Sequence, residues 1–584
     1  MLLAAFVSLQ YLGYRRMTAA DLIRLASAIG SVRSHFCNQN CAFISRIWQT
    51  SSITAALRKS KQAARQASTP SSSTVPNAIS KTRSYFTIRN NQNVRMYSTP
   101  SDPPVSDAQS KRKEARAQMM RDRQNQYLQQ RVQKMTESTV PTTRIGRVLH
   151  YGGIAAGMGI GALREGVRRL SEYDEAGSSN NRSLLMSPAN LELLVRRLSR
   201  MRGAALKLGQ MISFQDSSFL PPEIQTALTR VQDSADYMPK RQLDKVLTGD
   251  LGSNWRERFS SFDDVPMAAA SIGQVHAAVL ADSGLDVAVK VQYPGVADSI
   301  SSDLNNIALL LTASSVLPKG LYLENTIANA RTELAWECDY IREAENLQRF
   351  AKILENDPVL SIPKVFPDLS GKHVLTMERM FGIGVTRIDD LDQNKKNWIA
   401  TEIMKLTLRE ISEFHYMQTD PNWTNFLYNE STGRIELLDF GASREYPDDF
   451  VYNYTGVLKS AVHNDSEGCE YYSRKLGYLT GLESPTMLKA HLDSILTLAE
   501  PFDQTGRISM IGPDECYDFA NQTVTDRVRA LIPVMIRERL TPPPEETYSL
   551  HRKLSGAFLL CARLNAKVPC KALFHDIVEN VNSK

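Results

Sequence analysis

The 584-residue sequence predicts an α+β fold in two lobes, a small mixed lobe at residues 266–380 and a mostly helical lobe at residues 381–584. An alanine-rich loop followed by the strand pattern Val287-Ala-Val-Lys290 indicates the smaller lobe. Helical patterns, interrupted by one hairpin before Asp439, indicate the larger lobe. A hydrophobic content of 42% is sufficient for a sizeable core.

Residues 1–97 differ sharply in charge from the rest of the chain. They contain 13 of the 69 basic residues and one of the 63 acidic residues, and they are rich in Ser, Ala and Thr. This composition is typical of a mitochondrial presequence, and Arg95-Met-Tyr97 before Ser98 resembles a matrix processing site. We therefore predict a transit peptide over residues 1–97. The remaining residues have a net charge of −6, which argues against a nucleic-acid partner.

The seven cysteines contain no Cys-x-x-Cys pair and do not follow the pattern of a secreted disulfide framework. They are Cys37, Cys41, Cys338, Cys469, Cys516, Cys561 and Cys570. A reducing compartment fits this distribution best.

Residues 98–183 connect the leader to the folded region. Residues 98–147 are polar and charged, which predicts a linker or a solvated helix; a basic face on acidic lipid is a secondary interpretation. Residues 148–163 are uncharged and place three glycines at spacing four, the pattern by which membrane helices approach closely. They fall short of the ~20 residues of a usual span, so a glycine-rich connector is an equal alternative. We predict a membrane-associating helix there, and a second linker over residues 164–183.

An N-terminal helical extension is predicted over residues 184–265. Its clearest element is an amphipathic helix from Asn190 to Gln210, which ends in Lys207-Leu-Gly209-Gln210. From the residues alone, Lys207 complements the dipole at the end of this helix.

The alanine-rich loop is a candidate phosphate cradle, because small residues let backbone N–H groups approach phosphate oxygens. Lys290 on the following strand would bind the same phosphates as a point charge. Alanine replaces the glycine of the usual kinase loop, so we expect a stiffer loop and altered nucleotide preference rather than loss of binding. The candidate nucleotide-binding residues of this loop are Ala268, Ala269, Ala270, Ser271, Ile272, Gly273 and Gln274.

Lys290 needs a carboxylate partner inside the fold, and an acidic helix predicted from Asn329 to Leu354 is the best source. The spacing leaves Glu337 and Glu343 open as candidates. A strand over residues 373–378 then leads to a hinge, where the backbone of Glu378 and Met380 would hold adenine. A further helix is predicted from Asn397 to Met417.

The pattern Asp420-x4-Asn425, followed past a hairpin by Asp439-Phe-Gly441, predicts the chemical centre. Asn425 and Asp439 offer the hard oxygen ligands that suit Mg²⁺ bound together with ATP or ADP phosphates. Asp420 would face the attacking group. After Gly441 the chain enters a helical region almost at once, without the Ala-Pro-Glu segment where protein kinases dock peptides.

These motifs resemble the UbiB family, also called the aarF-domain or atypical kinase-like family, and are most similar to its mitochondrial members that support coenzyme Q (ubiquinone) biosynthesis. The resemblance covers residues 184–584. It rests on Lys207-x-Gly209-Gln210, Ala268-Ala-Ala-Ser271-Ile-Gly-Gln274, Val287-Ala-Val-Lys290, Glu337-x-Asp339, Asp420-x4-Asn425 and Asp439-Phe-Gly441.

The resemblance implies a protein-kinase-like fold whose N-terminal extension covers the active site. Lys207 and Gln210 would face Glu337 and Asp339, in the place where a peptide would bind, and Glu343 would then be the partner of Lys290. It also implies ATPase activity, suppressed protein kinase activity, and a location on the matrix side of the mitochondrial inner membrane. The implied partners are coenzyme Q biosynthesis enzymes, acidic cardiolipin-like phospholipids and phenolic or prenylated quinone precursors; a homodimer is a further expectation.

The leading functional hypothesis is therefore an ATP- and Mg²⁺-dependent ATPase or atypical small-molecule kinase. A protein kinase acting on coenzyme Q biosynthesis proteins is one alternative, disfavoured by the missing Ala-Pro-Glu segment. A nucleotide-gated, non-catalytic scaffold is the other, disfavoured by the complete set of Lys, Asp, Asn and Asp-Phe-Gly residues.

Overall fold

The computed structural model describes most of the chain from Asp236 onward. The described ranges are residues 236–314, 323–388, 390–506 and 515–580, together with positions 115, 118–119, 121–122, 124–126, 136–137, 157, 160–161 and 164. The predicted transit peptide, most of residues 98–183, and the helix that carries Lys207, Gly209 and Gln210 lie outside these residues.

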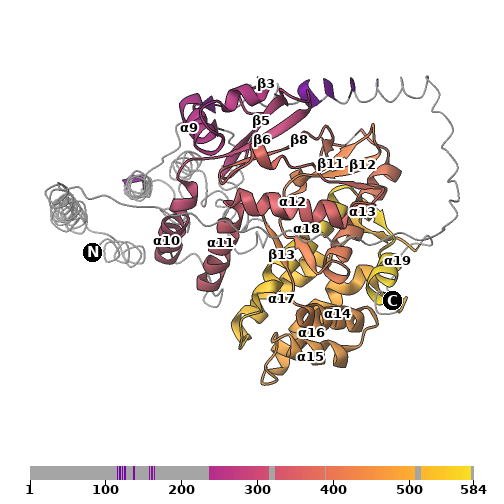
Figure 1. The fold of residues 1–584 in the computed structure, drawn as a ribbon. Coiled ribbons are helices and arrows are strands. Elements are labelled where there is room, and N and C mark those ends of the chain that lie inside the picture. The colour runs from indigo at the N-terminus through magenta and orange to yellow at the C-terminus, as the bar shows by residue number, and fades with distance from the viewer. Residues whose placement is uncertain are drawn as a thin grey trace, which may run out of the picture. The chain divides into compact units, whose positions relative to one another are not determined.

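An antiparallel sheet of five strands forms the smaller lobe within the described residues (Figure 1). Its strands are β3 (Phe259–Phe262), β4 (Ala268–Ala269), β5 (Gly273–Leu280), β6 (Asp286–Gln292) and β8 (Val374–Glu378). The spatial order is β3-β5-β6-β8, and β4 pairs with β5. Alternation along β6 buries Val287, Val289 and Val291 in the core and turns Lys290 to the other face. This alternation therefore determines which face of the sheet carries Lys290.

Helices α9 (Lys240–Leu251) and α12 (Tyr340–Ile353) pack on this sheet. Between β6 and α12, helices α10 (Val296–Ser314) and α11 (Leu323–Glu337) pack against each other. They form the long connection between the strand that carries Lys290 and helix α12.

The larger lobe is built around helix α13 (Gln393–Ser412), of which ten residues are buried. A four-stranded sheet of order β7-β12-β11-β9 lies beside it, formed by β7 (Leu360–Ser361), β9 (Ile383–Gly384), β11 (Phe426–Asn429) and β12 (Arg434–Leu437). The β11–β12 hairpin turns at Gly433, whose φ of 70° favours glycine. Strand β10 (Tyr416–Gln418) pairs with β13 (Ser443–Glu445) and brings the two ends of the predicted chemical centre together.

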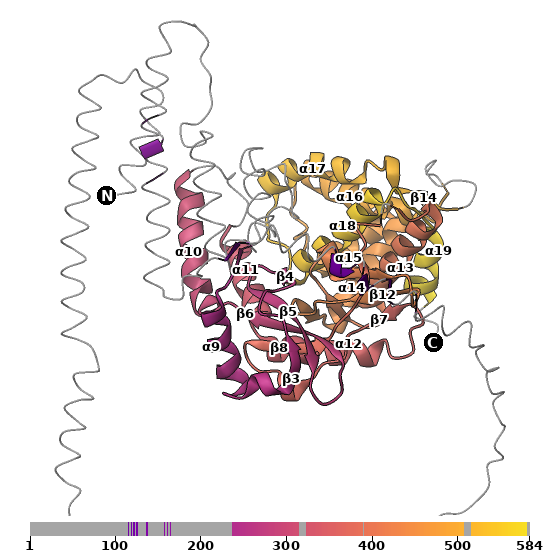
Figure 2. The same cartoon turned by 90° about the horizontal axis from the view of Figure 1, so that it is seen from above.

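The rest of the larger lobe is mostly helical, as Figures 1 and 2 show. Its helices are α14 (Asp448–Val462), α15 (Ser466–Lys475), α16 (Pro485–Ala499), α17 (Val524–Glu538), α18 (Glu545–Arg563) and α19 (Cys570–Phe574). Two short pairs complete the described strands: β14 (Tyr517–Asp518) with β15 (Lys567–Val568), and β1 (Thr136–Glu137) with β2 (Asp236–Tyr237). None of the described helices has the length and apolar character needed to cross a membrane.

Three sequence-predicted boundaries are wrong. The acidic helix predicted from Asn329 to Leu354 is two helices, because Asp339 caps α12 by accepting a hydrogen bond from the Arg342 N–H. The helix predicted to reach Met417 ends at Ser412, and His415 then adopts a positive φ of 49°. The strand after the alanine-rich loop begins at Gly273, inside the loop predicted over residues 268–274; from the sequence we expected this strand to begin only at Ala277.

Candidate functional site

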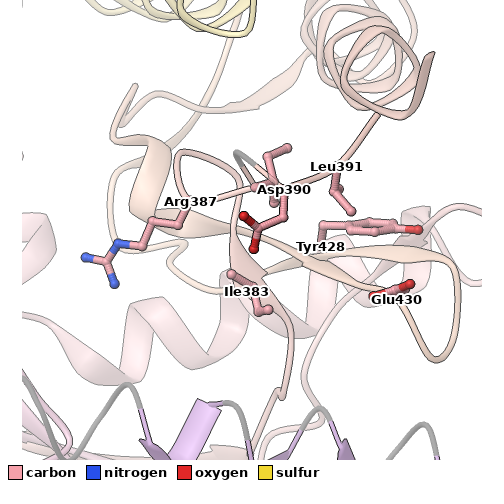
Figure 3. A pocket seen from close by; sticks show the side chains of 7 residues that line it. Ile383, Arg387, Asp390, Leu391, Tyr428 and Glu430 are labelled. Carbon is pink, nitrogen blue, oxygen red and sulfur yellow. The ribbon is translucent and has the colours of Figure 1, made fainter. Parts of the chain in front are cut away.

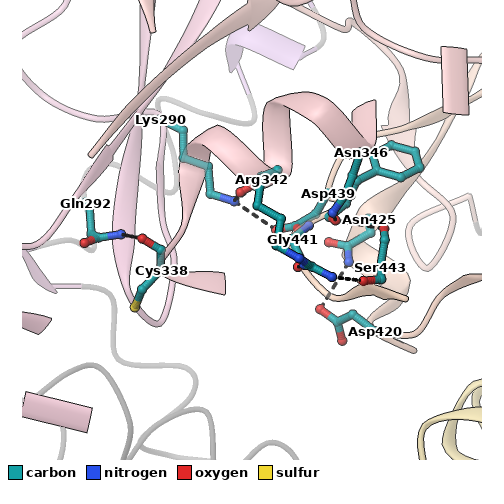
Figure 4. Close-up of polar contacts among 12 residues, drawn as sticks. Lys290, Gln292, Cys338, Arg342, Asn346, Asp420, Asn425, Asp439, Gly441 and Ser443 are labelled. Atoms are coloured by element: carbon teal, nitrogen blue, oxygen red, sulfur yellow. Dashed lines mark hydrogen bonds and ion pairs between the residues drawn. The ribbon is translucent and has the colours of Figure 1, made fainter. Parts of the chain in front are cut away.

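Lys290 lies at the centre of a buried group of charges that comes from both lobes. Its Nζ donates to Oε1 and Oε2 of Glu343 at 2.7 and 2.8 Å, and to Oδ2 of Asp439 at 3.2 Å (Figure 4). The Lys290 and Glu343 side chains are 8% and 0% exposed, whereas that of Asp439 is 35% exposed. The structure thus pairs Lys290 with Glu343 and brings it into contact with Asp439.

Two carboxylates share this one ammonium group. Burial opposes the charge of Lys290, but Asp439 and Glu343 outweigh it and hold the pKa of Lys290 above its ordinary value. Burial also raises the pKa of Glu343 to about 7; Lys290 works against this rise, and nearby Asp439 adds to it. Lys290 therefore keeps its positive charge at neutral pH beside the more exposed Asp439.

Helix α12 holds the backbone of the Asp439-Phe-Gly441 segment. Nη1 of Arg342 donates to the Gly441 oxygen at 2.7 Å, and Nη2 donates to the Ser443 oxygen. Nδ2 of Asn346 donates to the Phe440 oxygen at 2.9 Å. The Phe440 ring is 1% exposed and lies 4.7 Å from that of Phe350, measured between centroids. These contacts fix the position of Asp439 relative to the helix that carries Glu343.

Asp420 and Asn425 lie in the loop between β10 and β11 and contact each other. Nδ2 of Asn425 donates to Oδ2 of Asp420 at 3.3 Å, and the Asn422 N–H donates to Oδ1 of Asp420 at 3.2 Å. The Asn425 main-chain oxygen accepts from the Leu438 N–H at 3.0 Å, so Asn425 lies beside Asp439. The tertiary structure therefore gathers all three polar residues of the predicted centre.

This donor set fits a magnesium ion bound jointly with phosphate. With its NH₂ group committed to Asp420, Asn425 offers an amide oxygen, and Asp439 offers a partly exposed carboxylate. Among the described residues, no group of three or more His, Cys, Asp or Glu side chains forms a metal-binding cluster. Two protein oxygens completed by phosphate and water are the arrangement that Mg²⁺ commonly adopts.

The alanine-rich segment is a tight hairpin. Ala268 and Ala269 form β4 and pair with Val275 and Gln274 of β5. The turn covers residues 270–273, closed by the Ala270 N–H donating to the Gly273 oxygen at 2.8 Å. Only Ala270, Ser271 and Ile272 remain as loop, and Ile272 is 3% exposed. Any phosphate contact here therefore falls to backbone N–H groups or to the Ser271 hydroxyl.

The Gln274 side chain points into the smaller lobe instead of toward the loop. Its Oε1 accepts from the Met238 N–H at 2.8 Å, so its NH₂ group faces Nε2 of His276 at 2.8 Å. Nδ1 of His276 must then carry the proton, which it donates to the Asp263 oxygen at 2.7 Å. This buried chain of hydrogen bonds supports the first residues of strand β5.

The predicted hinge follows β8, and two residues near the N-terminus contact it. Nε2 of Gln124 donates to the main-chain oxygens of Met380 and Gly382 at 3.0 and 3.3 Å. Asn125 accepts a hydrogen bond from Arg379 at 2.8 Å. Sequence reasoning missed these residues because they lie in a uniformly polar run, with no signal that separates them from a solvated linker.

Helix α18 carries charged residues that sequence reasoning also missed. Nζ of Lys553 donates to the main-chain oxygen of Gln418 at 2.7 Å, just before Asp420. Nη2 of Arg552 donates to both carboxylate oxygens of Glu333 on α11 at 2.8 and 2.9 Å. Gly556 packs so closely on Pro421 that an added Cβ would lie 2.4 Å from the proline Cβ. One helix thus supports both the Asp420 loop and the helix that ends in Glu337.

Glu337 and Asp339 lie at the junction of α11 and α12, close to the Asp439-Phe-Gly441 segment. Glu337 is the last residue of α11 and is 8% exposed, and its Cα would lie 3.6 Å from a Cβ built on Gly441. Their predicted partners, Lys207 and Gln210, lie outside the described residues.

A small hollow elsewhere in the larger lobe contains none of these groups (Figure 3). It is lined by Ile383, Arg387, Ile388, Asp390, Leu391, Tyr428 and Glu430. No predicted site residue lines it.

Comparisons with known proteins identify the family. The ABC1 atypical kinase-like domain matches residues 230–473. A protein of Saccharomyces cerevisiae named "Atypical kinase COQ8, mitochondrial" is 54% identical over 443 residues, covering 76% of this chain and 86% of the relative. The chain belongs to the ABC1 atypical kinase-like family. Its relative of the same name in Schizosaccharomyces pombe is 51% identical over 446 residues, covering 76% of this chain and 71% of the relative.

Membership of the ABC1 family confirms the predicted resemblance and the protein-kinase-like fold, and the chain is an enzyme of the atypical kinase class. All candidate residues from Ala268 to Asp439 lie inside the matched range. Among solved structures, one match is the complex of Rv3197 with erythromycin from Mycobacterium tuberculosis. The match covers 67% of this chain and 96% of the Rv3197 chain, with 27% sequence identity and a TM-score of 0.46.

Proposed function

We propose that this chain is an ATP- and Mg²⁺-dependent atypical kinase-like ATPase that supports coenzyme Q biosynthesis. The observation that carries the proposal is the Lys290 ammonium held between buried Glu343 and partly exposed Asp439. Nucleotide phosphates need such a cation in a desolvated site and a carboxylate that can hold a metal beside it. The relatives' names, which place atypical kinases called COQ8 in mitochondria, support the pathway and the compartment.

Each residue of the site has a distinct role in this proposal. Lys290 binds phosphate oxygens, and Glu343 positions Lys290 through two short hydrogen bonds. Asn425 and Asp439 hold Mg²⁺, which when bound neutralises charge on the phosphates. Asp420 orients a water molecule or a substrate hydroxyl, and the backbone of Glu378 and Met380 holds adenine. The proposal also keeps the Lys207-x-Gly209-Gln210 motif as a cover of the site, in which Lys207 and Gln210 would face Glu337 and Asp339.

Two features favour hydrolysis or small-molecule transfer over protein phosphorylation. The segment after Gly441 forms β13 and enters α14 at Asp448, so it offers no extended stretch for a peptide. Strand pairing holds the alanine-rich hairpin together almost to its tip. This supports a stiff loop next to the nucleotide phosphates. A protein kinase activity toward coenzyme Q biosynthesis enzymes is the alternative that phosphate transfer by the purified protein would establish.

The proposed location is the matrix side of the mitochondrial inner membrane. The basic, acid-poor leader and the glycine-rich residues 148–163 support import and contact with acidic phospholipid. The partners in this proposal are coenzyme Q biosynthesis enzymes and phenolic or prenylated quinone precursors.

The test is ATP hydrolysis by the purified protein, with and without cardiolipin-containing vesicles and a phenolic quinone precursor. We expect Mg²⁺-dependent turnover that both additions increase, and loss of that turnover in the Asp439→Asn variant. Undiminished ATP hydrolysis by this variant would contradict the assignment of the metal site. Binding of nucleotide without any turnover would instead favour the scaffold hypothesis.

A further inference from the structure

One face of the smaller sheet meets the junction between α11 and α12. Strand pairing puts Gly273 opposite Gln292, and Val275 opposite Lys290, so Gly273, Lys290 and Gln292 share that face. Nε2 of Gln292 donates to the Cys338 oxygen at 2.8 Å and anchors the junction there (Figure 4). Two residues beyond Cys338, the first residue of α12 is Tyr340.

The Tyr340 side chain is completely buried against this face. A Cβ added to Gly273 would lie 2.6 Å from the Tyr340 hydroxyl oxygen, so the hydroxyl lies directly beside the end of the alanine-rich turn. Nζ of Lys290 is 5.1 Å from the centre of the Tyr340 ring. The hydroxyl therefore occupies the region where the turn and the lysine converge.

The Tyr340 hydroxyl has no hydrogen-bond partner within the part of the chain that the structure describes. Buried tyrosine hydroxyls are normally paired, because an unpaired one gives up its hydrogen bonds to water without replacement. Burial also raises the pKa of Tyr340 well above its ordinary value, so the hydroxyl keeps its proton at neutral pH. Among the described residues it is a donor without an acceptor, beside the cation proposed to bind phosphate.

We propose that Tyr340 is a nucleotide-binding residue whose hydroxyl donates a hydrogen bond to a phosphate oxygen of the bound nucleotide. Gly273 leaves room for the hydroxyl at the end of the turn, because any side chain there would collide with it. The inference deepens the proposed function and rests on it, since it adds an uncharged donor to the phosphate contacts assigned to Lys290 and the turn.

The test compares the full chain with its Tyr340→Phe variant, which removes only the hydroxyl. Melting temperature is measured without nucleotide, and the dissociation constant is measured for ATP with Mg²⁺. Without nucleotide, the variant should be as stable as the wild type or more stable, because no bond is lost. Its dissociation constant for ATP should rise about tenfold, as expected for losing a hydrogen bond to a charged group.

Tyr517→Phe is the matched control, because Tyr517 is equally buried and donates to Oε1 of Glu500 at 3.1 Å, in the distant β14 strand. This control should lower the melting temperature and leave ATP affinity unchanged. If the wild type binds ATP and Tyr340→Phe binds it equally well, the inference is overturned while the proposed function stands. A melting temperature lowered without nucleotide in Tyr340→Phe also overturns it. No ATP binding by the wild type would instead reject the proposed function.

Discussion

Gln124 donates its side-chain amide to the main-chain oxygen of Met380, 256 positions further along the chain. A second bond to the Gly382 oxygen and the Arg379 bond to Asn125 attach the same short segment to the hinge. A stretch that composition describes as a solvated linker thus contacts the backbone proposed to hold adenine. The described part of this segment therefore contacts the proposed adenine-binding hinge and is not only a connection.

Replacing Gln124 with Ala should weaken ATP binding. The substitution removes two hydrogen bonds that hold the hinge oxygens, and each is worth about 1 kcal/mol, so we expect the dissociation constant to rise about fivefold to thirtyfold. Gln118→Ala is the control, because Gln118 is exposed and bonds only with Asp122 of its own segment in the described structure. Titration with ATP checks both variants, and unchanged affinity in Gln124→Ala would contradict the proposed role of the segment.

Replacing Glu343 with Gln should lower ATP hydrolysis about 100-fold while the protein stays folded. Glutamine keeps the size of the side chain but removes the charge that positions Lys290, and small misplacements of a reacting group cost rates of this order. Glu345→Gln is the matched control, since Glu345 lies on the same helix and is exposed. The steady-state rate of ATP hydrolysis is compared between the two variants, and circular dichroism verifies that both are folded. Equal turnover in the two variants would show that the ion pair has no part in catalysis.

The buried pair of Arg552 and Glu333 should be strongly coupled. Glu333→Met leaves the guanidinium without its bonded partner and should cost about 3–5 kcal/mol of stability, and adding Arg552→Met should recover part of this loss. A double-mutant cycle measured by urea unfolding gives the coupling energy. The exposed pair of Lys489 and Asp493 serves as the contrast and should couple by less than about 1 kcal/mol. If the stability losses of the two single substitutions simply add in the double variant, the predicted coupling between Arg552 and Glu333 is contradicted.

Acid should destabilise the protein through His276. Burial lowers the pKa of His276 to about 4, below the 6.5 of an unfolded histidine. The unfolded chain therefore binds more protons between these values, so this contribution is complete above pH 6.5 and is lost as the pH falls toward 4. Its full size is roughly 3 kcal/mol.

Urea unfolding at pH 7 and pH 4.5 tests this, with His276→Asn beside the wild type. The variant should lose less stability over this window than the wild type does, because it lacks the titrating group. Burial also lowers the pKa values of His491 and His551 to about 4. The wild type and the variant both contain these two histidines, so the difference between their stability losses reports on His276 alone. An equal loss in the two proteins would contradict the assignment.

The sequence predicted which residues meet at the candidate site better than it predicted their surroundings. Short motifs specify Lys290, Asp420, Asn425 and Asp439 because each needs one residue type at a local spacing, and the structure brings these four together with Glu343. Helix boundaries were less predictable. The break at Asp339 depends on one capping hydrogen bond, which the run of acidic residues around it conceals.

By itself, the sequence determined the kinase-like fold, the family and the residue types at the candidate site, because local patterns and motif spacing encode them. The spacing left Glu337 and Glu343 open as partners of Lys290, the family resemblance implied Glu343, and the structure confirms that pair. Only the tertiary structure decided that Gln124 contacts the hinge, and that Tyr340 places beside Gly273 a hydroxyl with no partner among the described residues. The reason is physical. These contacts join residues dozens to hundreds of positions apart, and their geometry depends on how the sheet, α12 and α18 pack together, which no local pattern specifies.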